Sequence, residues 1–431
     1  MGMRFDRVAA GALAAAALLL AACGGDDSSS GGSDSGKPVT INWWHIQNTD
    51  PMKTIWKKAA DEYMASHPKV KIKITVLENE AFKAKLTTNM QAGNPPDIFQ
   101  SWGGGTLKEQ AEADLIKDIT GPTDSWIDSL NKAAVGLYKV DDKQYGVPFN
   151  LGMVGVWYNK SLFKKAGIDT PPSTWSEFLA DVEKLKAAGI TPIAVGEKDK
   201  WPGMFWWANL SLRVAGSDAM TKAGEDGSFD SDGFVKAGEE LKKLIDMEPF
   251  QKSFLAAPWP GANGEAGTMA KRGAAMDLMG QWAPNEFAAN TKDKQGLGED
   301  LGWFPFPQVE GGAGEEGEQF GGGDGFAIGK DAPKEAVDFV KYLSSREIAM
   351  KTGASGATLP VTEGTESSVK DPNMKAVLDA RGEASFVQLY LDQAYAPAVG
   401  GAINDAVQEL FAGKASPQEV SKKIADAAKA G

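Results

Sequence analysis

Residues 39–76 read VTINWWHIQNTDPMKTIWKKAADEYMASHPKVKIKITV, and this stretch decides the fold class. Residues 39–46 are rich in β-branched and aromatic types and predict a strand. Residues 70–76 alternate apolar with polar side chains, which is typical of a half-buried strand. Between them, residues 52–66 carry apolar side chains at helical spacing. A strand, a helix and a strand in this order predict a parallel pair joined by a right-handed crossover.

The alternation of strands and helices continues beyond this unit. Phe82, Leu86 and Met90 lie four residues apart and predict a second helix, and a third strand begins at Asp97. Residues 274–279 predict a buried strand, and helices dominate from Pro333 onward. We therefore predict an α/β fold of mainly parallel sheets flanked by helices, with the ligand beyond the carboxyl ends of the strands.

Composition excludes several classes of protein. The chain has 431 residues, which suffices for two or three domains, with 45 Lys plus Arg against 58 Asp plus Glu and a net charge of −13. This acidic balance argues against nucleic-acid binding, which needs a basic surface. One Cys and two His exclude a disulfide framework and nearly exclude a zinc site. We find no nucleotide-binding or metalloprotease motif and expect no cofactor and no metal.

The N-terminus has the pattern of a secretory signal. Arg4 and Arg7 precede an apolar run that ends in Leu-Ala-Ala-Cys, and this step resembles the lipobox of bacterial lipoproteins. We predict a signal peptide over residues 1–22, followed by a lipidated Cys23 and a flexible tether over residues 23–36, which is rich in Gly, Ser and Asp. The alternative is a chance Cys inside an ordinary signal peptide. Lipidation implies an extracytoplasmic protein, anchored to the outer face of the cytoplasmic membrane only through its lipid.

Six short motifs occur in an order that resembles a known family. They are the lipobox, Ile41-Asn42-Trp43-Trp44-His45, Pro96-Asp97-Ile98-Phe99, Trp157-Tyr158-Asn159-Lys160, Gly280-Gln281-Trp282 and Gly323-x-Gly325-Phe326-Ala327-Ile328. Together they resemble extracellular solute-binding protein family 1, the carbohydrate-binding proteins that serve ABC importers, which include maltodextrin-binding protein. The loops after residues 45 and 99 look most like those of actinomycete lipoproteins that bind xylobiose and xylo-oligosaccharides.

The resemblance implies a two-lobed, periplasmic-binding-protein-like (Venus-flytrap) fold with a multi-strand hinge. Placed on this chain, lobe 1 comprises residues 37–149 and 324–372, and lobe 2 comprises residues 150–323 and 373–431. Gly152 and Gly321-Gly322-Gly323 fall at the proposed crossings, where they either absorb the dihedral changes of closure or simply end strands.

Tryptophan is unusually frequent, with 13 Trp against 7 Tyr. Flat rings stack on the C–H faces of sugars, and several of these Trp residues stand beside Gly, Pro or Asn. Trp282 matches the main stacking position of the family, and Trp102 lies in a Gly-rich loop. Of Trp206 and Trp207 we expect one in the cleft and choose Trp206. Trp43 and Trp44 are neighbours on a strand and point to opposite faces, so at least one is structural.

Polar side chains near the strand ends and proposed crossings are candidates for binding sugar hydroxyls. They are His45, Gln47, Asn48, Glu80, Asn150, Asp324, Asp392 and Gln393. A solvated loop residue is the alternative for each of them.

Two classes of function compete. The first is a non-catalytic binder, a monomer that closes its lobes on an oligosaccharide and presents it to the membrane permease of an ABC importer. The second is a secreted glycoside hydrolase, which needs two carboxylates flanking one bond; Glu80 and Asp324 could be misread as that pair. Other sugars or a non-sugar solute also remain as ligands. The tether and the lack of a catalytic motif favour the binder.

Overall fold

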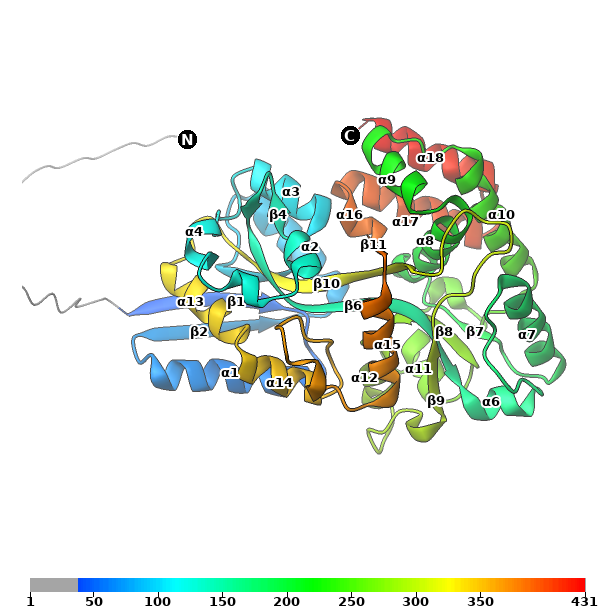
Figure 1. Cartoon of the computed structure of the whole chain (residues 1–431), viewed down its shortest axis with the longest axis horizontal. Coiled ribbons are helices and arrows are strands. Elements are labelled where there is room, and N and C mark those ends of the chain that lie inside the picture. Colours follow the sequence, from blue (N-terminus) through cyan, green and yellow to red (C-terminus); the bar gives the residue numbers. More distant parts are fainter. Residues whose placement is uncertain (1–37, 431) are drawn as a thin grey trace, which may run out of the picture. The chain divides into compact units, whose positions relative to one another are not determined.

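A computed structural model describes residues 38–430 (Figure 1). The predicted signal peptide, Cys23 and the tether lie outside the described residues. Within the described part, no helix is both long and apolar enough to cross a membrane.

Nine strands form one mixed sheet in the order β2-β1-β3-β10-β6-β8-β7, with β11 paired to β10 and β9 paired to β6. Two more strands, β4 and β5, form a separate hairpin. The strands are β1 (Val39–His45), β2 (Val70–Val76), β3 (Ile98–Ser101), β4 (Lys139–Val140), β5 (Lys143–Gln144), β6 (Gly146–Asn159), β7 (Ile193–Ala194), β8 (Met276–Gly280), β9 (Leu301–Phe304), β10 (Glu318–Ile328) and β11 (Phe386–Leu389).

The α-helices flank this sheet. They are α1 (Met52–Ser66), α2 (Asn79–Gln91), α3 (Gly104–Glu112), α4 (Thr120–Thr123), α5 (Lys132–Gly136), α6 (Lys160–Lys165), α7 (Trp175–Ala187), α8 (Trp201–Ala215), α9 (Ser217–Asp226), α10 (Asp232–Asp246), α11 (Glu265–Ala270), α12 (Ala283–Ala289), α13 (Lys334–Leu343), α14 (Arg346–Ala354), α15 (Pro372–Glu383), α16 (Leu391–Ala394), α17 (Pro397–Phe411) and α18 (Pro417–Ala430).

In lobe 1, β1 pairs in parallel with both β2 and β3, as the sequence predicts. The predicted helix over residues 52–66 is α1, which packs through Trp56 and Tyr63 on the sheet. Trp43 is fully buried beneath this helix, whereas Trp44 on the opposite face is only half-buried. Because the three parallel strands end together, their following loops meet at one edge of lobe 1.

Two long strands, β6 and β10, run between the lobes (Figure 1). They are antiparallel to each other, and β10 also lies antiparallel to β3, while β6 lies antiparallel to β8 and β9. The sheet is therefore more mixed than expected, because both crossing strands serve as central strands in the two lobes.

The glycines at the proposed crossings lie inside strands and do not end them. Gly152 pairs with Gly322 in the middle of β6 and β10. A Cβ on Gly321 would approach the carbonyl oxygen of Gly152 to 2.3 Å, and a Cβ on Gly322 would approach the ring of Tyr390 to 2.4 Å. These positions require glycine because of close approach, and whether they also bend on closure stays a prediction.

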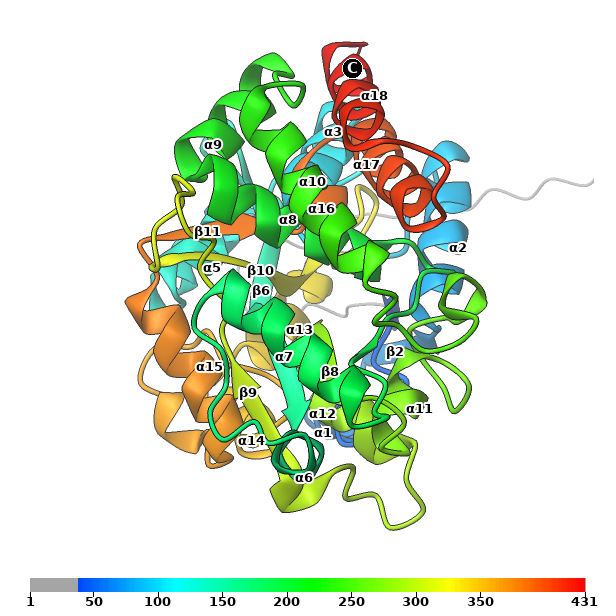
Figure 2. The ribbon, with the colours of Figure 1, turned by 90° about the vertical axis from the view of Figure 1, so that its right-hand side faces the viewer.

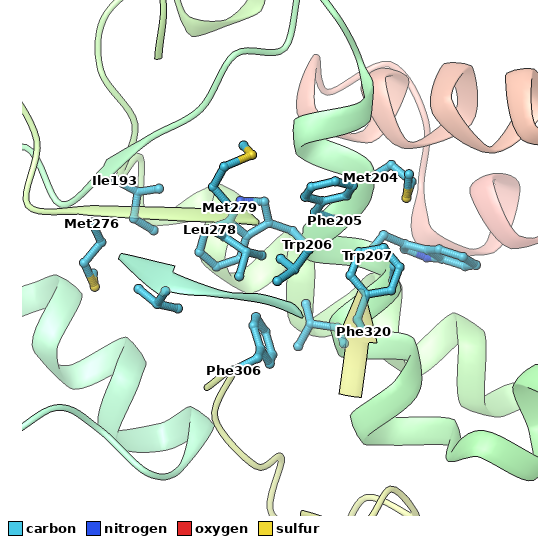
Figure 3. Packing of buried hydrophobic residues seen from close by; sticks show 14 of the residues in the cluster. Ile193, Met204, Phe205, Trp206, Trp207, Met276, Leu278, Met279, Phe306 and Phe320 are labelled. Carbon is cyan, nitrogen blue, oxygen red and sulfur yellow. The ribbon is translucent and has the colours of Figure 1, made fainter. Parts of the chain in front are cut away.

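Lobe 2 has an aromatic core beneath α8, and helices α7 and α10 cover the face seen in Figure 2. Figure 3 shows Trp206 and Trp207 among Leu278, Phe306 and Phe320. The predicted strand over residues 274–279 is β8, which is buried throughout.

The C-terminal part contains a strand that the sequence does not predict. Beyond Pro333, helices dominate as expected, but β11 pairs in parallel with the start of β10. Helix α15 packs on β6 and β9, and α17 and α18 pack on α8 and α10. The assignment of residues 373–431 to lobe 2, like the other lobe boundaries, stays a prediction.

Candidate functional site

A cavity of about 160 Å³ lies between the loops of lobe 1 and the aromatic residues of lobe 2. Its lining comes from the segments that follow β1, β2 and β3, from the start of α8, and from the segments after β8 and β11. The lining residues are Ile46, Gln47, Asn48, Thr49, Asp50, Pro51, Met52, Glu78, Asn79, Lys83, Trp102, Trp201, Phe205, Trp259, Pro260, Trp282, Asn285, Glu286, Asp324, Ala357, Tyr390, Asp392 and Gln393.

The wall from lobe 1 is mostly polar. Gln47 and Asn48 follow β1, and Glu78 and Asn79 follow β2. The Glu78 carboxylate caps α2 by accepting the backbone N–H groups of the second and third residues that follow it, at 3.1 and 3.4 Å. This cap fixes the start of α2, so the polar groups of this wall sit on well-defined backbone.

The wall from lobe 2 is aromatic. The ring of Trp282 lies edge-on to Trp201, Phe205 and Tyr390, with centroids 6.4, 6.4 and 6.0 Å away. The ring centroid of Trp259 in turn lies 6.1 Å from that of Trp201. Contacts of this kind are favourable arrangements for aromatic pairs and hold the rings in one orientation. The wall therefore offers a rigid apolar surface.

Gly280 sets the position of Trp282. A Cβ on this glycine, at the end of β8, would come within 2.0 Å of the Trp282 ring. The indole therefore lies directly across the strand end, and only glycine leaves room for it there.

Asp324 is the most constrained polar group of the cavity. Its two carboxylate oxygens accept hydrogen bonds from Gln100 Nε2 at 2.8 Å and Asn150 Nδ2 at 2.7 Å. The side-chain oxygen Oδ1 of Asn150 accepts a hydrogen bond from the backbone N–H of Leu359 at 2.8 Å. Burial raises the pKa of Asp324 to about 6 despite these donors and a further hydrogen bond from Trp102. The carboxylate is thus fixed in place by lobe 1 and the crossing strands.

Lys83 is the basic residue among the cavity-lining residues, and carboxylates hold it. Its Nζ lies 3.2 Å from Asp392 Oδ2 and 3.8 Å from Glu80 Oε1, and 5.5 Å from the centroid of the Trp102 ring. Burial lowers the pKa of Lys83, but Asp392 and Glu80 outweigh it, so the pKa is raised and the ammonium stays charged. The Lys83–Asp392 pair joins α2 of lobe 1 to the C-terminal α16.

A second bond joins the two walls directly. Thr49 Oγ1 in the loop after β1 donates to Glu286 Oε1 on α12, at 3.0 Å. Burial raises the pKa of Glu286, and the Thr49 hydroxyl acts in the opposite direction.

Seven of the predicted binding residues line this cavity: Gln47, Asn48, Trp102, Trp282, Asp324, Asp392 and Gln393. Glu80 is outside the lining and bonds to Asn79 and Lys83, which belong to it. Asn150 is buried behind Asp324 and reaches the cavity only through that carboxylate.

Two predicted residues are placed away from the cavity. Trp206 is 1% exposed and packs on Phe178 and Phe306, because α8 turns this position toward the core. His45 is also 1% exposed, and its ring packs on Trp43, since the last residue of β1 faces the interior of lobe 1. Burial lowers the pKa of His45 to about 3, which keeps it neutral.

The sequence reasoning missed most of the aromatic wall. Trp201 and Phe205 lie one helical turn apart at the start of α8, so they share the face opposite to Trp206. Trp259 stands beside proline residues in a loop. Trp102 was predicted because it lies in a loop, and the same reasoning could have identified Trp259. Nothing local marks Tyr390, whose position depends on Gly322 in a distant strand.

Three carboxyl groups lie buried behind the aromatic wall: Glu197, Glu265 and Asp277, each at most 1% exposed. Both carboxylate oxygens of Glu197 and of Asp277 have no hydrogen-bond partner among the described residues. Glu265 and Asp277 lie close enough for the charge of Asp277 to act on Glu265. Burial raises the pKa of all three, that of Asp277 to about 7. Among residues 38–430 no group of acidic, His or Cys side chains has the arrangement of a metal site.

Comparison with known proteins identifies the family to which this chain belongs. Residues 46–350 match the bacterial extracellular solute-binding proteins. An uncharacterized ABC transporter extracellular-binding protein of Pyrococcus horikoshii is 30% identical over 265 residues, 58% of this chain and 56% of that protein, so the match spans little more than half of this relative. The diacetylchitobiose binding protein of Streptomyces coelicolor is 26% identical over 403 residues, 90% of this chain and 88% of that protein.

The fold is also that of known structures. One from work on xylan utilization by the thermophilic bacterium Caldanaerobius polysaccharolyticus is 27% identical, with a TM-score of 0.83 over 90% of this chain and 99% of that one. The resemblance to extracellular solute-binding proteins and the predicted two-lobed α/β fold are thereby confirmed. The chain belongs to the family of bacterial extracellular solute-binding proteins.

Proposed function

We propose that this protein is the substrate-binding component of an ABC sugar importer and captures an oligosaccharide in the cavity between its lobes. The observation that carries the proposal is the contrast between the two walls: rings from lobe 2 face amides and carboxylates from lobe 1. A pyranose has apolar C–H faces and a rim of hydroxyls, so it needs both kinds of surface.

Xylobiose or a short xylo-oligosaccharide is the ligand that we propose. The loops after β1 and β3 resemble those of xylobiose-binding lipoproteins, and the solved structure from work on xylan utilization supports the same class. Chito-oligosaccharides are the main alternative ligands, because the diacetylchitobiose binding protein of Streptomyces coelicolor is similar to this chain.

The protein acts without catalysing a reaction. It closes its two lobes on the sugar and delivers the sugar to the permease as a monomer. Lobe 1 comprises residues 37–149 with 324–372, and lobe 2 comprises residues 150–323 with 373–431. Closure is a shift toward a form in which the ligand touches both walls. Cys23 carries the lipid that holds the protein on the outer face of the cytoplasmic membrane.

Titration of the protein with xylo-, cello-, malto- and chito-oligosaccharides, followed by tryptophan fluorescence and thermal shift, tests the proposal. We expect the largest response with β-1,4-xylo-oligosaccharides of two or more units, because Trp282 and its neighbours change environment on stacking. Silence across the whole panel overturns the sugar-binding proposal. Prolonged incubation with the bound sugar yields no new reducing ends if the protein is not a hydrolase.

A further inference from the structure

We infer that Lys83 and Asp392 make the cavity selective for charge: it accepts neutral and amine-bearing sugars and excludes sugars that carry a carboxylate. This inference rests on the proposed sugar-binding function and adds the chemical class of sugar that the site takes.

The first observation is the balance of charge in the lining. Five of the lining residues carry a carboxyl group: Asp50, Glu78, Glu286, Asp324 and Asp392. Lys83 is the single Lys, Arg or His in the same lining, which belongs entirely to the described residues. Glu80 and Asp199, which also act on Lys83, add further negative charge beside the cavity. A carboxylate on the ligand therefore meets a field of its own sign.

The second observation is that Lys83 is not free to bind an anion. Its Nζ lies 3.2 Å from Asp392 Oδ2, where Asp392 is the less exposed partner, with 10% exposure of its side chain against 28% for Lys83. Glu80 on the same helix lies at 3.8 Å, and the Trp102 ring lies beneath the ammonium. An ammonium has three donors, and these neighbours already surround it.

A uronic acid in this cavity therefore has two poor options. It either leaves its carboxylate without a cation among other carboxylates, or it takes Lys83 away from Asp392. In the second case Asp392 keeps only the hydrogen bond from Gln393 Nε2, at 3.1 Å, and loses its counter-ion. Building an unfavourable charge contact against the wrong ligand is a common source of specificity. A protonated amine meets the opposite field, so the same cavity tolerates an amino sugar.

Pairs of β-1,4-linked disaccharides that differ in one charge test this inference near pH 7. Cellobiose is compared with cellobiouronic acid, in which a carboxylate replaces one hydroxymethyl group, and N,N′-diacetylchitobiose is compared with its mono-deacetylated form, which carries one amine. We expect the acid to bind at least about tenfold more weakly than its neutral partner, since charges this close interact strongly in a partly enclosed site. The deacetylated form should bind no more than a few-fold differently from the acetylated one.

The variant D392N sharpens the test, because it releases Lys83 from its partner. The preference for cellobiose over cellobiouronic acid, measured as the ratio of the two affinities, should fall by about tenfold in D392N. In K83M this ratio should not fall. The matched control is D230N, which removes an aspartate from an exposed pair with Lys429, 3.0 Å apart and outside the cavity lining. D230N should leave the ratio unchanged.

The outcomes separate the two proposals. If a neutral disaccharide binds and the acid binds as tightly, or D392N leaves the ratio as it was, the charge-selectivity inference is wrong and sugar binding stands. If none of the four disaccharides binds and the oligosaccharide panel is also silent, the proposed function fails and the inference fails with it. Thermal melting of each variant shows whether a loss of binding reflects unfolding.

Discussion

The two walls of the cavity differ in chemistry and in how the chain builds them. The wall from lobe 1 consists mostly of polar side chains on the segments that follow three parallel strands, and one of them, Glu78, caps α2. The wall from lobe 2 consists of aromatic rings from four separate segments, which hold one another edge to face. The first wall suits the hydroxyl rim of a sugar, and the second suits its faces.

This difference indicates a division of labour. We expect stacking on the aromatic wall to supply most of the binding free energy, because it would bury large apolar surfaces on rings that are already ordered. The polar wall selects which hydroxyl pattern fits, since a buried polar group without a partner is costly. The experiments below break one wall at a time, and the first is expected to have the largest effect.

Replacement of Trp282 by alanine should abolish most of the binding. Its ring contacts three other aromatic residues and lies over Gly280, so its loss removes the centre of the wall. We expect the affinity for the best sugar of the panel to fall at least about 100-fold, which corresponds to about 3 kcal/mol, as measured by calorimetry.

The variants W282F and W126A are the controls for this change. W282F keeps a smaller ring and should retain part of the affinity. Trp126 is also partly buried, but it packs on lobe 1 away from the cavity, so W126A should bind normally. If W282A loses its cooperative melting transition, Trp282 serves the core and the proposed stacking role is wrong.

Buried carboxyl groups with raised pKa values lie behind the aromatic wall. Burial raises the pKa of Asp277 from 3.8 to about 7, and Glu265 shifts in the same direction. The unfolded chain therefore loses these protons at lower pH than the folded protein does. The folded state should therefore lose stability as the pH rises above about 4, by at most about 1.4 kcal/mol per pH unit for each group, and the contribution of Asp277 should level off above about pH 7.

Substitution of Asp277 by asparagine, which resembles the protonated acid, checks this behaviour. Denaturant unfolding at pH 5, 6, 7 and 8 should show a shallower loss of stability in D277N than in the unchanged protein, with a difference of about 2 kcal/mol between pH 5 and pH 7. An equally steep loss in D277N contradicts the assignment. E239Q, at an exposed carboxylate on α10, is the control.

Part of the lobe 1 wall could be predicted from the sequence, because these positions follow from strand ends, but Glu78, Asn79 and Lys83 were missed. Gln47 and Asn48 come directly after an obvious strand, and parallel strands bring their carboxyl ends to one edge. The prediction that His45 reaches the cavity missed by a single residue. His45 is still the last residue of β1, and the alternation of side chains along the strand turns it inward. Strand boundaries are the least certain part of such reasoning, and here the boundary decides whether a side chain meets the ligand.

The aromatic wall could be predicted only in part, because helix rotation and distant contacts decide it. The run Trp201 to Trp207 offers four large aromatic side chains, and apolar spacing alone does not tell which face of α8 turns to the cavity. The choice of Trp206 was wrong for this reason. The unpredicted strand β11 has only four residues, yet it carries the chain to Tyr390. Such a position depends on pairing with β10, about 70 residues earlier in the chain.

Removal of the amide that positions Asp324 should weaken the polar wall. N150A eliminates the donor to Asp324 and leaves the backbone N–H of Leu359 without its acceptor. We expect about tenfold weaker sugar binding and a loss of about 1–3 kcal/mol in stability. N159A is the matched control, because Asn159 is buried in the same strand and caps α6 away from the cavity. It should cost similar stability without the loss of affinity, and equal affinity losses in both variants would refute the positioning role of Asn150.

The smallest effect is expected where the two walls touch. Thr49 donates to Glu286 across the cavity, and valine at this position keeps the shape of the side chain but removes the hydroxyl. A single exchanged hydrogen bond contributes about 0.5–1.5 kcal/mol, so T49V should bind sugar about two- to tenfold more weakly. Since the bond exists only when the lobes approach, the ligand-free T49V protein should also occupy more open conformations, which small-angle scattering detects as a larger radius of gyration. T87V, which removes a hydroxyl that bonds only to the backbone of Lys83 on the exposed side of α2, should change neither quantity. If T49V and T87V behave alike, the contact between the walls contributes nothing to closure, and the ligand alone draws the lobes together.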